Sequence, residues 1–297
     1  FKEGASLLKL KNAVERLMNG IFFLCGITAI AAVVLISGYI IAAGLPAIRE
    51  IGLTNFLFGR VWASTAAEPQ FGILPFILTS VYGTLGAILI GVPVGLLTAI
   101  YLSKLASPRM SRVLRPAVEL LAGIPSVVYG LIGMLVLVPF VAKVFGLANG
   151  TSLFAATLVL AVMILPTIVS VSETALRAVP PEYEDASLAL GATRLETVFK
   201  VSLPAARSGL AAAVVLGIGR AVGEAMAVMM VAGNVANMPA LFKSVTFLTT
   251  AVAKEMSYAS GLQRQALFSI ALVLFCFIML LNTILNTLLK GKEGKNG

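Results

Sequence analysis

Long hydrophobic runs, separated by shorter polar segments, make up almost the whole chain. A helix needs about 20 mostly apolar residues to cross a hydrocarbon core about 30 Å thick, and the runs recur at that length. They predict six membrane-spanning helices, at residues 18–43, 71–103, 116–140, 152–172, 208–232 and 264–289. Because backbone groups inside a bilayer must bond within the protein, the pattern predicts an all-α integral membrane fold with one membrane domain.

The longest polar segment lies between the fourth and fifth predicted spans, and it predicts two short amphipathic helices over 181–203. Pro181 suits a first helical position, and the acidic residues after it suit the first turn of a helix. Gly191 is expected to end the first helix. Thr193 and Glu196 are spaced as a capping box and are expected to begin the second.

Composition supports a membrane protein and narrows its function. Of the 297 residues, 59% are hydrophobic and 12% are charged. The chain has no histidine, which excludes His-ligated zinc sites and Ser-His-Asp or Cys-His catalysis. It also lacks the G-x-x-x-x-G-K-[ST] run that binds nucleotide phosphates. We therefore expect no enzyme, no metal site and no cofactor in this chain, whose Cys25 and Cys276 lie in apolar runs and predict no disulfide.

The formal net charge of +9 comes from basic residues beside the ends of the apolar runs, which does not favour nucleic-acid binding. With six spans, 15 of the 22 basic residues fall on the side of the N-terminus, six fall in the opposite loops, and Arg220 lies inside a span. By the positive-inside rule, the N-terminal segment 1–17, the helices at 181–203 and the tail 290–297 are predicted to be cytoplasmic.

Two charged side chains, Arg220 and Glu224, lie inside the fifth predicted span. A charge at the bilayer centre costs at least about 2.5–3.5 kcal/mol, so such residues face an interior. Their i,i+4 spacing predicts that they pair on one helix face. In one hypothesis Arg220 binds a passing oxyanion through its planar guanidinium and Glu224 neutralises it when the path is empty. In the alternative, the pair only fixes helix packing and never meets the cargo.

The third predicted span contains Pro125, next to Ser126 and close to Tyr129. A proline in mid-membrane frees backbone groups that only a packed or water-lined interior can satisfy, so this helix is expected to face protein or a pathway. Ser126 and Tyr129 are candidates for a pathway lining or a gate. Equally, they can be part of a packing kink with satisfied hydroxyls.

One short pattern within 181–203 resembles a known family. Its residues are Glu184, Asp185, Ala186, Gly191 and the Val201-Ser202-Leu203-Pro204 ending. They resemble the EAA motif of ABC-importer permeases, with Asp185 where that family usually has alanine. The resemblance implies a six-helix type I (MetI-like) fold and an ATPase-coupling role for Glu184, Asp185, Ala186, Gly191, Leu203 and Pro204. ATP and Mg²⁺ would then be bound by a separate partner ATPase.

A second resemblance is narrower. The segments 124–130 and 219–228 are similar to those of phosphate-importer permeases of the Pst system, more to the C-type than to the A-type subunit. Ala225 departs from that pattern, because threonine is commoner there. The resemblance implies import of inorganic phosphate across the cytoplasmic membrane of a bacterium or archaeon. It also implies an A-type permease partner, two ATPase subunits and a phosphate-binding protein on the outer side.

Three alternatives remain open from the sequence. The chain could be the A-type subunit, or a permease for another oxyanion such as sulfate or molybdate, because one arginine does not distinguish tetrahedral anions. An ion-gradient-driven secondary transporter is of a different class and should show paired repeats with broken helices, which we do not find in the sequence.

Overall fold

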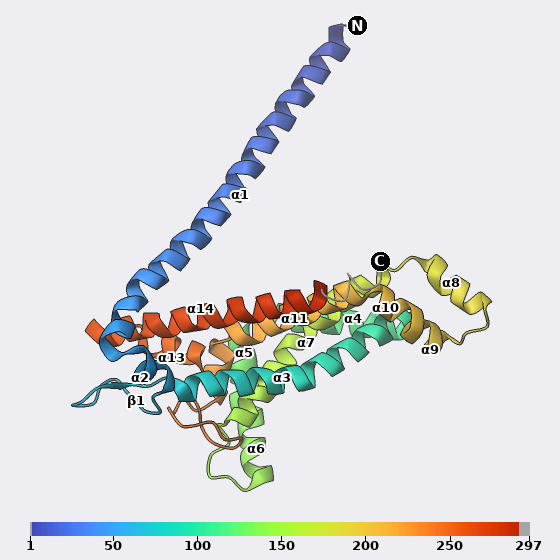
Figure 1. The fold of residues 1–297 in the computed structure, drawn as a ribbon. Helices are drawn as coiled ribbons and strands as arrows, with labels where there is room; N and C mark the ends of the chain where they lie inside the picture. Colours follow the sequence, from blue (N-terminus) through green and yellow to red (C-terminus); the bar gives the residue numbers. More distant parts are fainter. Residues whose placement is uncertain (1, 291–297) are drawn as a thin grey trace.

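A computed structural model describes residues 2–290 and contains almost only helices (Figure 1). The first helices are α1 (Lys2–Ile51), α2 (Leu53–Phe58), α3 (Leu74–Ile100), α4 (Pro108–Gly123), α5 (Ser126–Ile132), α6 (Val138–Phe145) and α7 (Leu153–Arg177). They are followed by α8 (Pro181–Ala189), α9 (Arg194–Thr197), α10 (Leu203–Ala205), α11 (Arg207–Gly223), α12 (Met226–Val231), α13 (Leu248–Glu255) and α14 (Gly261–Lys290). Three π-helical turns, η1 (Tyr101–Leu105), η2 (Gly133–Leu137) and η3 (Val198–Ser202), lie between them. Strands β1 (Trp62–Ala63) and β2 (Gln70–Phe71) pair antiparallel.

Five of the described helical segments are long and apolar enough to cross a membrane. A sixth crossing arises when the segments 194–205 and 207–223, which meet at a bend of 73°, are taken as one. The all-α membrane fold expected from the sequence is therefore confirmed. The tail at 290–297 lies, apart from its first residue, outside the described residues.

Two of the predicted spans are not single helices. The third was expected as one helix over 116–140, but α4 ends at Gly123, and a new helical segment begins at Ser126 and runs to Phe145. The reason is Pro125, which lacks a backbone N–H and holds an extended conformation between α4 and α5. The fifth was expected as one helix over 208–232, but α11 ends at Gly223 and α12 begins at Met226.

Helix α7 occupies the centre of the bundle, between α3 and α11. Its Leu160, Ile164 and Ile168 are completely buried. A Cβ atom at Gly91 of α3 would lie 2.7 Å from Ile164, and one at Gly217 of α11 would lie 2.9 Å from Ile168. Small residues at these positions let the helices approach closely, as is usual where helices pack within a membrane.

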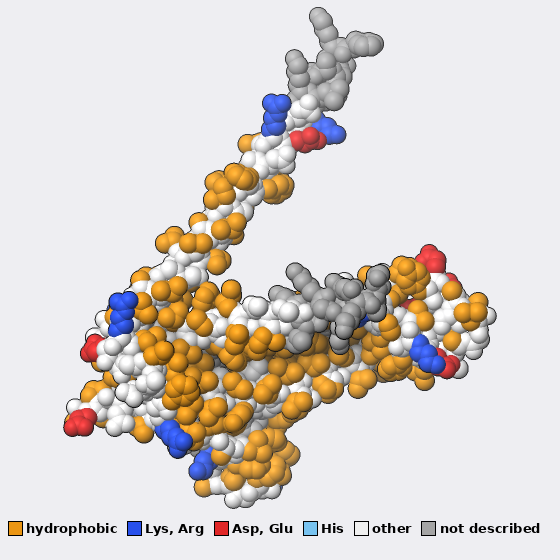
Figure 2. Space-filling model, in the orientation of Figure 1, with side chains coloured by type: hydrophobic (Ala, Val, Ile, Leu, Met, Phe, Trp, Pro, Cys, Tyr) orange, Lys and Arg blue, Asp and Glu red, His pale blue; other side chains and the backbone are white. Residues whose placement is uncertain are grey.

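Helix α1 leaves the body of the protein and leans away from it (Figure 1). Only its C-terminal part contacts α14, where Ser269 Oγ donates a hydrogen bond to the Gly44 carbonyl and Tyr39 packs edge-on against Phe268. Exposed hydrophobic side chains lie along the described part of α1 and over much of the bundle (Figure 2). Such an extent of exposed apolar surface requires lipid or a protein partner around it.

Candidate functional site

Two helix breaks lie close together in the bundle. One separates α4 from α5 at Pro125, and the other separates α11 from α12 at Glu224. The segments that follow the breaks pack against each other: a Cβ atom at Gly130 of α5 would lie 2.8 Å from Cα of Ala227 of α12. Broken helices in a membrane leave backbone groups that need partners or water, so this region is the candidate pathway.

Arg220 and Glu224 do not pair, and the expectation from the sequence was wrong on this point. Because α11 ends at Gly223 and Glu224 is extended, the i,i+4 geometry of a continuous helix is lost. Arg220 Nη1 donates a hydrogen bond to Thr167 Oγ1 of α7 at 3.2 Å. The Glu224 carboxylate instead accepts one from the Ala227 backbone N–H at 2.9 Å and caps the start of α12.

Tyr129 holds the first break together. Its side chain is 8% exposed, and its hydroxyl donates a hydrogen bond of 2.6 Å to the carbonyl of Leu121, in the last turn of α4. Ser126, the first residue of α5, is half-buried. Thus Tyr129 satisfies a helix end, whereas a pathway role for Ser126 stays a prediction.

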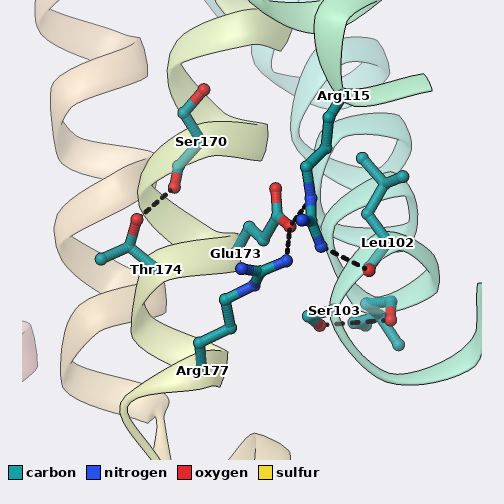
Figure 3. Close-up of polar contacts among 8 residues, drawn as sticks. Leu102, Ser103, Arg115, Ser170, Glu173, Thr174 and Arg177 are labelled. Carbon is teal, nitrogen blue, oxygen red and sulfur yellow. Dashed lines mark hydrogen bonds and ion pairs between the residues drawn. The ribbon is translucent and has the colours of Figure 1, made fainter. Parts of the chain in front are cut away.

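A charged cluster that the sequence did not single out lies further along α7 (Figure 3). Glu173 Oε1 lies 2.7 Å from Arg115 Nε of α4 and 2.9 Å from Arg177 Nη2 of its own helix. Arg115 Nη2 also donates to the carbonyl of Leu102 at 3.5 Å. From the sequence, these arginines were counted only as basic residues beside the membrane, and their common carboxylate could not be identified without the packing of α4 on α7.

Glu184, the first residue of the EAA-like motif, connects helix α8 to two other elements through its side chain. Its carboxylate forms an ion pair with Lys104 of η1 and accepts a hydrogen bond of 2.8 Å from Ser202 Oγ of η3. The hydroxyls of Ser187 and Thr197 lie 3.0 Å apart and tie α8 to α9. Glu184 is therefore a positioning residue for the segment 181–203, a role that its spacing in the sequence does not reveal.

The turn between α8 and α9 follows the prediction. Gly191 has a φ of +87°, which only glycine adopts without strain, and it follows the end of α8. The capping box is present: Thr193 Oγ1 accepts from the Glu196 N–H, and Glu196 Oε2 accepts from the Thr193 N–H. Hydrogen bonds that the Thr193 N–H and the Thr193 hydroxyl donate to the Glu196 carboxylate, together with the hydrogen bond and charge of Lys200, lower the pKa of Glu196.

The other residues of the motif lie on different faces of the segment. Asp185 and Ala186 are exposed, and Leu203 is half-buried against the apolar cluster formed by the ends of α3, α4 and α7. Pro204 is exposed, and α10, which follows the π-helical turn η3, ends one residue later at Ala205. That turn already interrupts the regular hydrogen-bond ladder in which a proline would leave a gap.

Apolar side chains are exposed around the turn. Leu190 is 90% exposed, and Tyr183, Leu195 and Phe199 are each more than half exposed. In a segment with charged residues and no long apolar run, such side chains indicate a protein-binding surface. Within residues 2–290 no group of His, Cys, Asp or Glu residues could hold a metal ion.

Comparisons with known proteins agree with the resemblances. The family model described as "Binding-protein-dependent transport system inner membrane component" matches residues 91–291. The chain is 42% identical over 266 residues to the probable ABC transporter permease protein YqgH of Bacillus subtilis, covering 86% of each. It is 35% identical over 263 residues to the phosphate transport system permease protein PstC of Pasteurella multocida, covering 82% of each. PstC 2 of Mycobacterium tuberculosis is 31% identical over 299 residues, covering 94% of this chain and 92% of that protein.

Among solved structures, an inward-facing MetNI methionine ABC transporter chain matches with a TM-score of 0.55 and 23% identity, covering 74% of this chain and 94% of that chain. This likeness concerns the fold alone. It agrees with the expected MetI-like arrangement of helices. Taken with the sequence matches, it shows that the chain belongs to the family of binding-protein-dependent transport system inner membrane components.

Proposed function

We propose that this chain is the C-type permease subunit of an ATP-driven importer that moves inorganic phosphate into the cytoplasm. The similarity to relatives named PstC, at 31–35% identity over more than four fifths of the chain, carries the proposal. The geometry is compatible with an anion as cargo. Arg220 lies beside the second helix break, and its guanidinium is held by the neutral hydroxyl of Thr167 rather than by a carboxylate. Its positive charge therefore remains available to an anion.

The chain supplies the route, and a partner supplies the energy. The segment 181–203 carries exposed apolar side chains at its turn, and Glu184 links it to η1 and η3. Its buried Val198 packs with residues of α3 and α7 in one apolar cluster. A movement imposed on the turn by an ATPase would therefore be transmitted to the helices of the pathway.

The same proposal implies the partner subunits of this chain. Two ATPase subunits, with bound ATP and Mg²⁺, would bind on the cytoplasmic side, where the turn lies. An A-type permease subunit would complete the pathway, and a phosphate-binding protein would deliver the anion from outside. Both termini would then be cytoplasmic, in a multi-pass protein of the cytoplasmic membrane, as the distribution of basic residues predicts.

Uptake of radiolabelled phosphate by the complete complex in proteoliposomes tests the cargo. We expect ATP-dependent uptake that excess phosphate inhibits and excess sulfate or molybdate does not. Uptake that sulfate abolishes would assign the chain to another oxyanion. Uptake that persists without ATP but follows an imposed ion gradient would assign it to the secondary transporters.

Copurification tests the ATPase surface. Leu190→Asp places a charge at the most exposed apolar position of the turn, and we expect at least a tenfold loss of ATPase bound to the permease. Val235→Asp is the matched control, because Val235 is also exposed but lies in the loop after α12. Equal retention of the ATPase by both variants would place the docking surface elsewhere.

A further inference from the structure

The second half of α7 has an exposed polar face. Thr167, Ser170, Thr174 and Arg177 are spaced by three or four residues and therefore lie on one side of the helix. Thr167 is half-buried, and the other three are exposed, whereas the neighbouring Ile168 and Val169 are buried. The Thr174 hydroxyl donates to the Ser170 carbonyl of its own helix, but the charge of Arg177 on the same face requires water or protein rather than hydrocarbon.

This face connects two cationic sites. It begins at Thr167, which binds Arg220, and ends at Arg177, ten residues later on the same helix. Ten residues of α-helix span about 15 Å. Because Arg177 is the last residue of α7 and the segment 181–203 follows it closely in the chain, the second site would be at the cytoplasmic end of the pathway.

At that end, Arg115 and Arg177 line a polar cavity of about 290 Å³ together with Glu173 and Ser170. A water molecule occupies about 30 Å³ in the liquid, so the cavity has room for a tetrahedral anion with some of its water. The two guanidiniums contact a single oxygen of Glu173, at 2.7 and 2.9 Å. Each guanidinium has five donors, and most of these ten donors have no protein acceptor in the described part of the chain.

We propose that Arg115 and Arg177 form a binding site for a phosphate group at the cytoplasmic end of α7. Glu173 holds the two side chains in place when the site is empty, and an anionic phosphate group competes with its carboxylate for their free donors. Two planar guanidiniums facing one cavity suit the bidentate geometry of phosphate oxygens. The phosphate group could belong to the transported anion on its way out, which rests on the proposed function, or to an anionic phospholipid of the inner leaflet.

Binding of radiolabelled inorganic phosphate to the membrane complex of permeases and ATPases, prepared without the phosphate-binding protein, tests the site. The complex is placed in nanodiscs of phosphatidylcholine alone, and separately of phosphatidylcholine mixed with phosphatidylglycerol. Arg115→Gln and Arg177→Gln are each expected to weaken phosphate binding about tenfold, the effect of losing a charge-assisted hydrogen bond. Glu173→Gln is expected to strengthen it, because the competing negative charge is removed. Arg112→Gln is the control, since Arg112 lies exposed on the same helix as Arg115 and outside the cavity.

A different result is expected if the phosphate group belongs to a phospholipid. Binding of inorganic phosphate is then unchanged in all variants, but Arg115→Gln and Arg177→Gln retain less phosphatidylglycerol after purification than Arg112→Gln does. The proposal is overturned if both arginine variants match Arg112→Gln in both measurements. It is also overturned if Glu173→Gln weakens binding as the arginine variants do, since that would make the cluster a purely structural tie.

Failure of this site and failure of the proposed function can be told apart. If the wild-type complex takes up no phosphate with ATP, the cargo assignment is wrong whatever the variants show. If the wild-type complex takes up phosphate and Arg220→Gln stops the uptake, the proposed function is supported. The binding measurements then test only the site at Arg115 and Arg177.

Discussion

Arg220 and Glu224 act as separate residues, because the helix that carries Arg220 ends between them. We expect Arg220→Gln to lower phosphate uptake by about 10- to 100-fold, the range for loss of a hydrogen bond to a charged group. Glu224→Gln should stay within about threefold of wild type, since a carboxamide oxygen can still accept from the Ala227 N–H. Initial uptake rates at equal protein content measure both. A Glu224→Gln variant as inactive as Arg220→Gln would mean that the carboxylate charge itself is needed.

Gly191 is required for its backbone conformation and not for lack of space. Its φ is +87°, and a Cβ atom there would meet nothing within 4 Å. Left-handed backbone costs about 1–2 kcal/mol for most residues and less for asparagine. We therefore expect ATPase retention to fall in the order glycine, Gly191→Asn, Gly191→Val, measured by copurification. Equal losses for the two variants would indicate a steric contact with the ATPase instead.

For individual residues, the sequence predicted contacts between neighbours in the chain and missed contacts between distant segments. The capping box of Thr193 and Glu196 and the turn at Gly191 depend on neighbours in the chain, and both are present. The prediction of an Arg220–Glu224 pair was wrong, because no proline in the sequence marks the helix break at Glu224. The segment after the break packs closely on Gly130, which lies 97 residues away from Ala227 in the chain.

Among the elements, the segment 181–203 is joined to the end of the second span through one ion pair, that of Glu184 with Lys104. We expect Glu184→Gln to keep the hydrogen bond from Ser202 but to lose the charge attraction, so that ATP hydrolysis continues with less transport. The number of ATP molecules hydrolysed per phosphate should rise at least twofold. Lys104→Gln should give the same change, and the double variant should add nothing further. Additive effects would show that the two side chains act independently.

The stability of the first turn of helix α9 should depend on pH. The pKa of Glu196 is lowered in the folded protein, chiefly by the hydrogen bond from the Thr193 N–H. Its contribution to stability is therefore present above the ordinary glutamate pKa of about 4.3 and is lost as the pH falls through the lower, folded value. Hydrogen exchange across residues 191–198, corrected for intrinsic rates, should accelerate in that acidic range. Glu196→Gln should keep the cap without this acid dependence, and an unchanged profile would remove the carboxylate as the cause.

For the whole molecule, the all-α membrane fold follows from the lengths of the apolar runs, which is why the sequence predicted it. The runs carry no information on which helices touch. The central place of α7 depends on glycines of α3 and α11 that fit its isoleucines, and the projection of α1 depends on a single contact region with α14. Neither the polar face of α7 nor the Arg115–Glu173–Arg177 cluster could be inferred without those contacts.

The attachment of α1 to the bundle depends on Gly44, and this gives a matched pair of variants. A Cβ atom at Gly44 would lie 2.9 Å from the backbone of Phe268, whereas one at Gly38, on the same helix, would meet nothing within 4 Å. In the isolated chain we expect Gly44→Val to lower the free energy of unfolding by about 1–3 kcal/mol, as overpacking does, and Gly38→Val to have little effect. Thermal unfolding in detergent measures both. If Gly38→Val is neutral alone but weakens assembly of the complete complex, a partner subunit covers α1. If Gly38→Val is neutral in both measurements, lipid surrounds this part of the helix. Equal losses of stability for Gly38→Val and Gly44→Val in the isolated chain would contradict the attachment of α1 at Gly44.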